Sequence, residues 1–476
     1  MDRRATQRGM AIFIAVLALA LAGGLVLLVQ AASLSSARRD HVSERALAQA
    51  REALLAFASD RPITAVVGPG FLPCPDLDDD GWAESTCGSL AGDRGQEERL
   101  GRLPWKTLGL PDLRDGHGER LWYAVSTRYK GLLNCAASAA CVDLSPATGL
   151  GTITVRDNSG RVLHDGTLAD ADRGGAAAVI IAPGAPLTRQ SPAGSREQHR
   201  DCAPGDCNTH GQCVTKPPSR AARCDPGNYL DLAPPERSGE DNADFHDRSD
   251  AGRVLNGNGF IQGPVVDARG RVAVNDRLAV VAYTDVMPRV ARRVGLELAQ
   301  CLAFFASRPE NAGRLPRASP ACPGVGTAGR IPDTPFDTAP GMLTRWWRAE
   351  PRRPEVLTEL PTQAQACNIA VPPADAGQTR TLAAGNPSDE GATAGVDDLS
   401  WWRTWKPFVL YVPAADLEVV DAEGHLLAAN RRAAIVVGMR RDECETPRLA
   451  CDASSCTRVT SAPLPGRVHD AVIALP

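Results

Sequence analysis

At 476 residues, the chain is long enough for about two or three domains, and its 43% of hydrophobic residues is enough to build buried cores. A net charge of -4 and a pI near 6.1, without a dense basic stripe, give no support for nucleic-acid binding. The 14 cysteines are even in number and clustered at short spacings, which indicates disulfides in an oxidising compartment and argues against a cytosolic protein.

The N-terminal segment begins with basic residues and then loses all charge for a membrane-length stretch. Arg3, Arg4 and Arg8 precede the run Met10–Val29, which contains no charged residue. Crossing a bilayer core takes about 20 residues. Because the next basic pair is Arg38 and Arg39, the charge distribution predicts a cytoplasmic N-terminus and an exported remainder.

A helical pattern continues directly from this apolar run. Leu25–Ser59 contains neither Gly nor Pro, and apolar residues recur at helical spacing at Val42, Ala46, Leu47, Ala50, Leu54 and Phe57. We therefore expect one long helix to leave the membrane and enter the soluble part. The alternative is a cleavable signal peptide that ends at the small residues Ala31 and Ala32, but a flexible cleavage region would then follow.

The residues around Gly9 resemble the processing site of the type IV prepilin and pseudopilin family. Gln7-Arg8-Gly9-Met10, followed by the apolar Ala11–Leu17, is similar to the site where that family's leader is cleaved after the glycine and the new N-terminus is methylated. The resemblance implies that prepilin peptidase processes the chain between Gly9 and Met10. Most family members carry Glu five residues after the cleavage point, whereas this chain has Ile14.

An internal repeat predicts two related structural units. The segments Leu55–Pro62, Gly70–Cys74 and Gly101–Pro104 correspond, in order, to Phe304–Pro309, Gly313–Pro316 and Gly329–Pro332. Predicted strands and hairpins follow in the same order in both copies: Arg120–Val125 with Pro407–Val412, Ile153–His164 with Leu417–Leu427, and Ala176–Ala182 with Ala433–Val437.

Each copy thus reads as a helix followed by a small antiparallel sheet. The predicted fold class is α+β, with a long N-terminal membrane-spanning helix leading into tandem pilin-like helix-plus-antiparallel-sheet units. We expect a leader and transmembrane helix over residues 1–35, a first pilin-like unit over 36–187, a Cys/Pro/Gly-rich insertion over 188–262 and a second unit over 263–476. A third hairpin, Val265–Val274, is assigned to neither unit; the strand Leu278–Tyr283 then leads into the second helix.

An acidic loop is the best candidate for a chemical site. Asp76, Asp78 and Asp80 alternate ahead of Gly81, as in the first half of an EF-hand-like calcium loop, and Glu84 occupies its ninth position. The twelfth position, where a bidentate Glu would bind, is Cys87, which we expect to close the loop as a disulfide with Cys74. The loop is predicted either to hold a structural calcium ion or to be a solvated acidic hairpin.

The remaining cysteines favour disulfides over metal binding. Cys202, Cys207, Cys213 and Cys224 lie near His199 and His210, but without a CxxC pair the spacing suits two bridges better than a zinc site. Cys135 and Cys141 are expected to bridge a small loop.

The sequence predicts no enzymatic activity. It contains no GxSxG, HExxH, P-loop or GxGxxG motif. His117 is interpreted as a polar turn residue. The tryptophans suit core or interface packing better than a sugar or peptide platform: Trp346, Trp347, Trp401, Trp402 and Trp405.

These observations predict a minor pilin or pseudopilin-like structural subunit at the tip of a type IV pilus or type II secretion filament. The resemblance implies the tip, because the acid missing at Ile14 would otherwise pair with a neighbour's N-terminal ammonium. Expected partners are other pilin or pseudopilin subunits, the inner membrane and prepilin peptidase, and not nucleic acid. The expected location is single-pass in the inner membrane, with the bulk periplasmic or extracellular on a filament. The alternative is a membrane-anchored periplasmic binding protein or adhesin that does not assemble.

Overall fold

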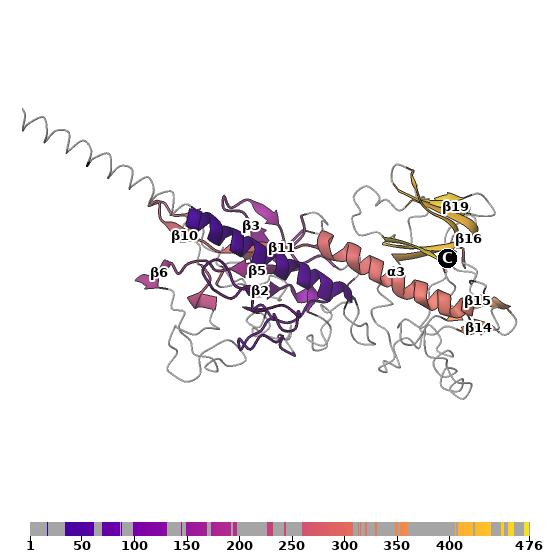
Figure 1. Ribbon diagram of the computed structural model, residues 1–476, viewed down its shortest axis with the longest axis horizontal. Helices are drawn as coiled ribbons and strands as arrows, with labels where there is room; N and C mark the ends of the chain where they lie inside the picture. The colour runs from indigo at the N-terminus through magenta and orange to yellow at the C-terminus, as the bar shows by residue number, and fades with distance from the viewer. Residues whose placement is uncertain are drawn as a thin grey trace, which may run out of the picture.

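A computed structural model gives the architecture of the chain. It describes residues 34–60, 69–85, 99–130, 149–168, 173–191, 226–231, 259–307, 408–421 and 424–438, together with shorter pieces that include the last strands. Two helices lie one after the other along the long axis of the molecule, and each lies beside its own sheet (Figure 1).

The first helix is continuous over residues 34–60 and covers one face of a four-stranded antiparallel sheet, the first sheet. Ala46, Ala50, Leu54 and Ala58 recur every four residues and are all buried in one cluster with Tyr123 of the sheet. The sheet order is β1-β2-β5-β11, with bounds β1 Leu100–Arg102, β2 Trp122–Val125, β5 Ala178–Ala182 and β11 Arg277–Val281.

The opposite face of the first sheet carries a second apolar layer. Trp122 and Ile181 point into this layer and pack with Val155 and Phe260. Its strands are β3 (Thr154–Arg156), β4 (Val162–His164) and β8 (Gly259–Ile261), in the order β4-β3-β8 with β8 parallel to β3. The remaining elements of this half are the hairpins β6 (Thr188–Ser191) with β7 (Gly194–Glu197) and β9 (Val265–Val266) with β10 (Val272–Val274), and the 3-10 turns η1 (Thr127–Tyr129) and η3 (Pro226–Asn228).

Part of the predicted insertion is held against the first sheet by a buried cation. The Arg102 guanidinium carbon lies 4.2 Å from the ring centroid of Trp122 and 4.0 Å from that of Tyr229. Burial lowers the pKa of Arg102, against the opposing influence of Tyr229. Residues 226–231 are therefore fixed to the sheet by stacking on a guanidinium as well as by apolar packing.

The second helix, α3 (Tyr283–Ser307), packs against β17 and β20 of a seven-stranded sheet, the second sheet. Its main order is β12-β13-β16-β17-β20, and β19 joins β16 in parallel and pairs with β18. The bounds are β12 Ser319–Pro320, β13 Gly329–Arg330, β16 Val409–Val420, β17 Leu426–Val437, β18 Leu449–Cys451, β19 Cys456–Thr460 and β20 Ala471–Leu475; β14 (Arg348–Glu350) and β15 (Arg353–Glu359) form a separate hairpin.

The two sheets pair their strands in the same register. In the first sheet, Tyr123 lies between Gly101 and Ile180. In the second sheet, Tyr411 lies between Gly329 and Ile435. This register sets Tyr123 level with Tyr411, one position away from the match implied by comparing Arg120–Val125 with Pro407–Val412.

The helix ends and the added strands also match. Gly70 N donates to Ala58 O and Gly313 N donates to Ala306 O, each at 3.0 Å, after the corresponding helix. The parallel pairing of β3 with β8 in one half has its counterpart in the parallel pairing of β16 with β19 in the other. The two halves of the chain are thus similar in their individual strands and also in the order in which these strands pair.

The predicted membrane-spanning helix is the part of the fold class that the structure contradicts. Among the residues the structure describes, no helix is both long enough and apolar enough to cross a membrane. The physical reason is that each described helix has a charged face: residues 34–60 include Arg38, Arg39 and Asp40, and α3 includes Arg292 and Arg293. The uncharged run Met10–Val29 lies outside the described residues, Leu17 excepted.

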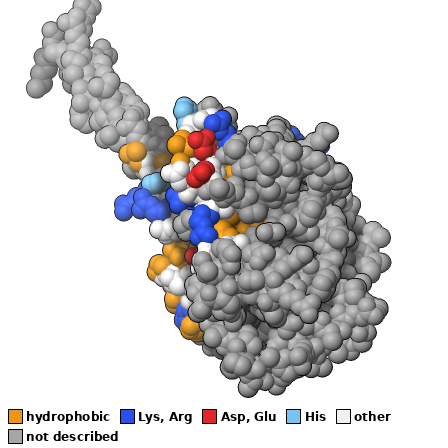
Figure 2. All heavy atoms as spheres, turned by 90° about the vertical axis from the view of Figure 1, so that its right-hand side faces the viewer, with side chains coloured by type: hydrophobic (Ala, Val, Ile, Leu, Met, Phe, Trp, Pro, Cys, Tyr) orange, Lys and Arg blue, Asp and Glu red, His pale blue; other side chains and the backbone are white. Residues whose placement is uncertain are grey.

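The first helix and α3 meet through ion pairs and a shared core. Arg51 pairs with Asp285 at 2.6 Å, and Glu52 pairs with Arg289 at 2.7 Å. One buried cluster contains residues from both helices and both sheets. Seen end-on, acidic, basic and hydrophobic side chains lie side by side on the described part of the facing surface (Figure 2).

Candidate metal centre

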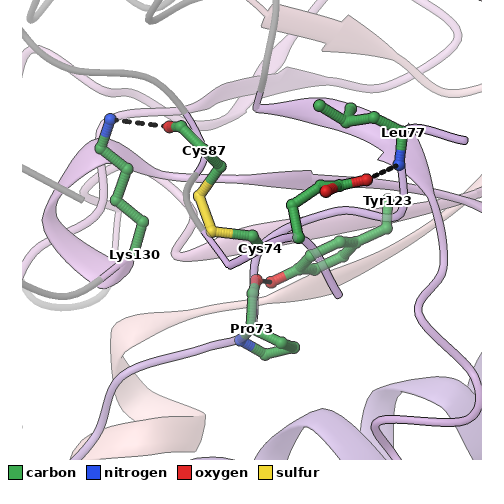
Figure 3. The surroundings of a disulfide bond; sticks show 7 residues. Pro73, Cys74, Leu77, Cys87, Tyr123 and Lys130 are labelled. Carbon is green, nitrogen blue, oxygen red and sulfur yellow. Dashed lines mark hydrogen bonds between the residues drawn. A yellow bond between two sulfur atoms is a disulfide. The ribbon is translucent and has the colours of Figure 1, made fainter. Parts of the chain in front are cut away.

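The acidic loop is closed at its base by a disulfide. Cys74 and Cys87 are bonded, with their Cα atoms 5.5 Å apart. Lys130 Nζ donates to Cys87 O at 3.0 Å, and the Tyr123 hydroxyl donates to Pro73 O at 3.0 Å (Figure 3). Both ends of the loop are therefore held by buried groups of the first sheet and of the turn after it.

Backbone pairing fixes the first carboxylate of the loop. Asp76 N donates to Arg102 O at 3.0 Å and Arg102 N donates to Asp76 O at 2.7 Å, so the loop adds a bridge to the edge strand β1. A Cβ on Gly101 would lie 2.7 Å from Asp76 O and 2.8 Å from Leu77 Cδ2. Glycine at position 101 is thus what lets the loop approach the strand so closely.

Three carboxylates converge in the loop. Asp76, Asp78 and Glu84 each offer an oxygen, and these oxygens lie within 4.8 Å of one another. Asp76 is buried at 1% exposure, whereas Asp78 is exposed and Glu84 is intermediate. Convergent oxygens from one short segment suit a hard cation such as Ca²⁺.

The environment of Asp76 makes its protonation unusual. Burial raises the pKa of Asp76 to about 7, with smaller contributions from the charges of Asp79, Asp78 and Asp80, and a hydrogen bond from Gly81 N opposes the rise. Gly81 N donates to Asp76 Oδ2 at 2.7 Å, and Asp80 N donates to Oδ1 at 3.2 Å. A cation bound beside Asp76 would oppose this rise, because a nearby positive charge favours the ionised carboxylate.

Asp80, expected as a ligand, is not part of the converging trio. Its Oδ1 accepts a hydrogen bond from Trp82 N at 2.7 Å, and the Lys106 ammonium donates to the Asp80 carbonyl oxygen. Gly81 has a φ of +89°, as expected for the turn after an alternating acidic run. The side chain at the fifth position of the loop is therefore used to shape the turn.

A charge network that the sequence did not predict lies beside the loop. Asp79 has a φ of +63°, and its Oδ1 lies 2.6 Å from Arg120, which also pairs with Asp112 at 2.9 Å. These two partners and their hydrogen bonds raise the pKa of Arg120, although burial acts in the opposite direction. Nothing in the sequence pointed to Arg120 as the partner of Asp79, because the two residues are distant along the chain.

Calcium fits the loop only in part. Ca²⁺ takes about 6–8 oxygen ligands, and the trio supplies three side chains from the first, third and ninth positions. Cys87, at the twelfth position, is in the disulfide and offers no carboxylate. The residues present fit an ion that completes its coordination with backbone carbonyls and water, and they do not fit a full EF-hand.

Other predicted site residues fall in different places. Gly9 and Met10 lie outside the described residues, as do Cys135, Cys141, Cys202, Cys207, Cys213 and Cys224. His117 lies in a turn, where its N–H donates to Asp115 Oδ1 at 2.8 Å. Trp405 is fully buried in the core shared by the two sheets, whereas the other four tryptophans named above are outside the described ranges.

Comparisons with known proteins find no matching family model, no similar curated protein and no similar solved structure.

Proposed function

We propose that this chain is an exported structural subunit that acts by assembly, a minor pilin- or pseudopilin-like component of a type IV pilus or type II secretion filament. The observation that carries the proposal is the duplicated arrangement of a helix on an antiparallel sheet, with Gly101, Tyr123 and Ile180 in the same register as Gly329, Tyr411 and Ile435. Duplication of a packing module suits a protein that presents a large surface to other subunits. The motif Gln7-Arg8-Gly9-Met10 supports the same family.

Assembly is proposed in preference to catalysis because the candidate metal-ligand group found among the described residues contains acids alone. Asp76, Asp78 and Glu84 are all acids, and Asp76 and Glu84 accept hydrogen bonds from the backbone of the loop itself. A hydrolytic site would need a nucleophile held by a base. A structural calcium ion that fixes this surface loop is the cofactor we propose.

Export is proposed from the disulfide. Cys74 and Cys87 are bonded next to a buried tyrosine and a buried lysine. Disulfides of this kind form and persist in the periplasm or outside the cell. We place the bulk of the protein there, on the filament.

The experiment that tests this function is determination of the mature N-terminus in the native host. Mass spectrometry should find a chain that starts at Met10 with a methylated amine, and Gly9→Leu should retain the leader and abolish incorporation into filaments. A mature N-terminus near Ala32, or a Gly9→Leu variant that assembles as well as the natural protein, would refute the proposal.

A tip location is the finer part of the proposal and depends on Ile14. A carboxylate missing from an apolar helix bundle leaves a neighbour's ammonium without a partner, which is costly except at an end. Quantitative proteomics of purified filaments should find this chain far below the major subunit, with label at one end. Label spread along the shaft would contradict it.

The binding-protein alternative is favoured by one observation. Trp82 is 55% exposed beside the acidic loop, with the Lys106 ammonium 6.0 Å from its ring centroid. An aromatic ring exposed in this way can contact a ligand. Absence of Gly9 processing, together with loss of ligand capture in Trp82→Ala, would favour this alternative.

A further inference from the structure

The β9–β10 hairpin has one buried face and one exposed apolar face. Val265 and Val274 are buried with Ile261. Val266 and Val272 are cross-strand partners and are 55% and 46% exposed. The two valine side chains therefore lie next to each other on a face that the other described residues leave exposed.

The tip of this hairpin is held by hydrogen bonds of Asp267 and carries arginines. Asp267 Oδ1 accepts hydrogen bonds from Arg269 N and Arg271 N, each at 2.9 Å, and Asp267 Oδ2 pairs with Arg271 at 2.8 Å. Arg269 is exposed at the outermost part of the turn, before Gly270 with its φ of +76°. The exposed valines are thus flanked by cations on a preformed turn.

The hairpin lies at the end of the molecule where the described part of the first helix begins. β10 leads directly into β11, whose first residue, Arg277, pairs with Asp40 at 2.8 Å and with Glu44 at 3.3 Å. Figure 1 shows β10 beside the start of this helix. Leu34, at 71% exposure, and the exposed Arg38 lie in the same helical turns. We call residues 34–45 together with residues 264–277 the basic end face.

Positive charge exceeds negative charge on the basic end face. Its sequence holds the arginines Arg38, Arg39, Arg45, Arg269, Arg271 and Arg277, against the carboxylates Asp40, Glu44, Asp267 and Asp276. Asp276 is fully buried, and the other three acids pair with arginines of the same face. Arg38, Arg39, Arg45 and Arg269 remain as exposed cations beyond these pairs.

We propose that the basic end face lies against an anionic lipid surface, with Val266, Val272 and Leu34 in the headgroup layer and the arginines on the lipid phosphates. Exposed aliphatic side chains among arginines are the composition of interfacial membrane-binding surfaces. Charge complementarity favours this occupant over a second copy of the chain, because a self-contact would bring like-charged arginines together. The basic end face would bind anionic lipid whether or not the chain assembles into filaments.

The test is amide hydrogen exchange of the whole protein with phosphatidylcholine vesicles that contain or lack phosphatidylglycerol. The anionic vesicles should slow exchange in residues 264–274 and 34–45. Replacing Arg269 or Arg38 by Gln should each raise the vesicle concentration for half-protection about fivefold, as expected from about 1 kcal/mol per arginine near the surface. Val266→Asp with Val272→Asp should remove the protection.

A matched control exists in the second sheet. The turn Asp421–Gly424 has the same hydrogen bond from Gly N to Asp O, and Leu426 and Leu427 after it are 57% and 58% exposed. Leu426→Asp with Leu427→Asp should leave protection of the basic end face unchanged. Vesicle binding without protection of these segments, equal protection by neutral vesicles, or protection that appears with rising protein concentration alone would each overturn the proposal; the last would identify a contact between copies.

Discussion

Asp76 is a buried carboxylate in the middle of an acidic loop, and its proton competes with any cation that the loop holds. Its pKa in the folded protein is raised from an ordinary 3.8 to about 7, chiefly by burial. A raised pKa stabilises the fold below the unfolded pKa, and that contribution is lost as pH rises through 7. The rise corresponds to roughly 4 kcal/mol, as an upper bound.

We therefore expect the melting temperature in chelator to fall between about pH 4 and pH 7. Calcium should raise it increasingly as pH approaches and passes 7, because the ion binds the deprotonated trio. Asp76→Asn should abolish both effects. Thermal melts across pH with and without calcium measure them, and pH-independent melts with no calcium response would show that the loop is an acidic hairpin only.

Asp80 is a calcium ligand according to the sequence motif, but it is not one of the three converging carboxylates in the structure. Its Oδ1 accepts from Trp82 N, a contact that an asparagine oxygen can keep. Asp80→Asn should therefore leave most of the calcium response, whereas Asp78→Asn should remove most of it. Equal loss in the two variants would mean that Asp80 turns toward the ion when calcium binds.

Gly101 lies so close to the acidic loop that a side chain at this position would clash with it. A Cβ there would meet Asp76 O at 2.7 Å and Pro75 Cβ at 2.9 Å. We expect Gly101→Ala to destabilise the protein by about 1–3 kcal/mol through displacement of the loop. Gly424→Asn, at a φ of +87° with nothing within 4 Å, is the control and should cost less. Equal denaturant midpoints for the two variants would contradict the close approach.

At the scale of elements, the disulfide and the strand β1 together position the acidic loop. The sequence separation of Cys74 and Cys87 is 13 residues, and cross-linking a loop of this size stabilises by about 3 kcal/mol through the unfolded chain. Replacing both cysteines by Ser should lower the melting temperature and weaken calcium binding, because the ends of the loop separate. An unchanged melt and an unchanged calcium titration would show that the β1 bridge alone positions the loop.

At the scale of the whole molecule, the shared core predicts that both halves unfold together. Ala50, Leu298 and Ile435 come from the first helix, α3 and β17, yet all lie in one buried cluster. Leu298→Ala should destabilise by about 2–5 kcal/mol, and calorimetry should still show one transition. Leu296→Ala, two residues away at 40% exposure, should cost little. Two separate transitions, only one of them shifted, would mean that the halves are independent.

The sequence by itself determined the local features that depend on short spacings. Helical periodicity placed Ala46, Ala50 and Leu54 on one buried face, and the spacing of glycine and aspartate placed the turns at Asp157–Gly160 and Asp421–Gly424. The disulfide between Cys74 and Cys87 was expected from the short loop between them, and the structure contains it. In each case the interacting residues lie within a few helical turns or one hairpin, so the types of nearby residues are enough to predict the contact.

Only the tertiary structure decided the associations between distant segments. β11 follows the insertion in sequence but pairs with β5, and Arg120 reaches Asp79 across the fold. Asp80, which the alternating motif made a ligand, bonds to Trp82 N and lies outside the converging trio. Spacing cannot reveal these outcomes, because they depend on which strand edges and charges meet once the cores have packed.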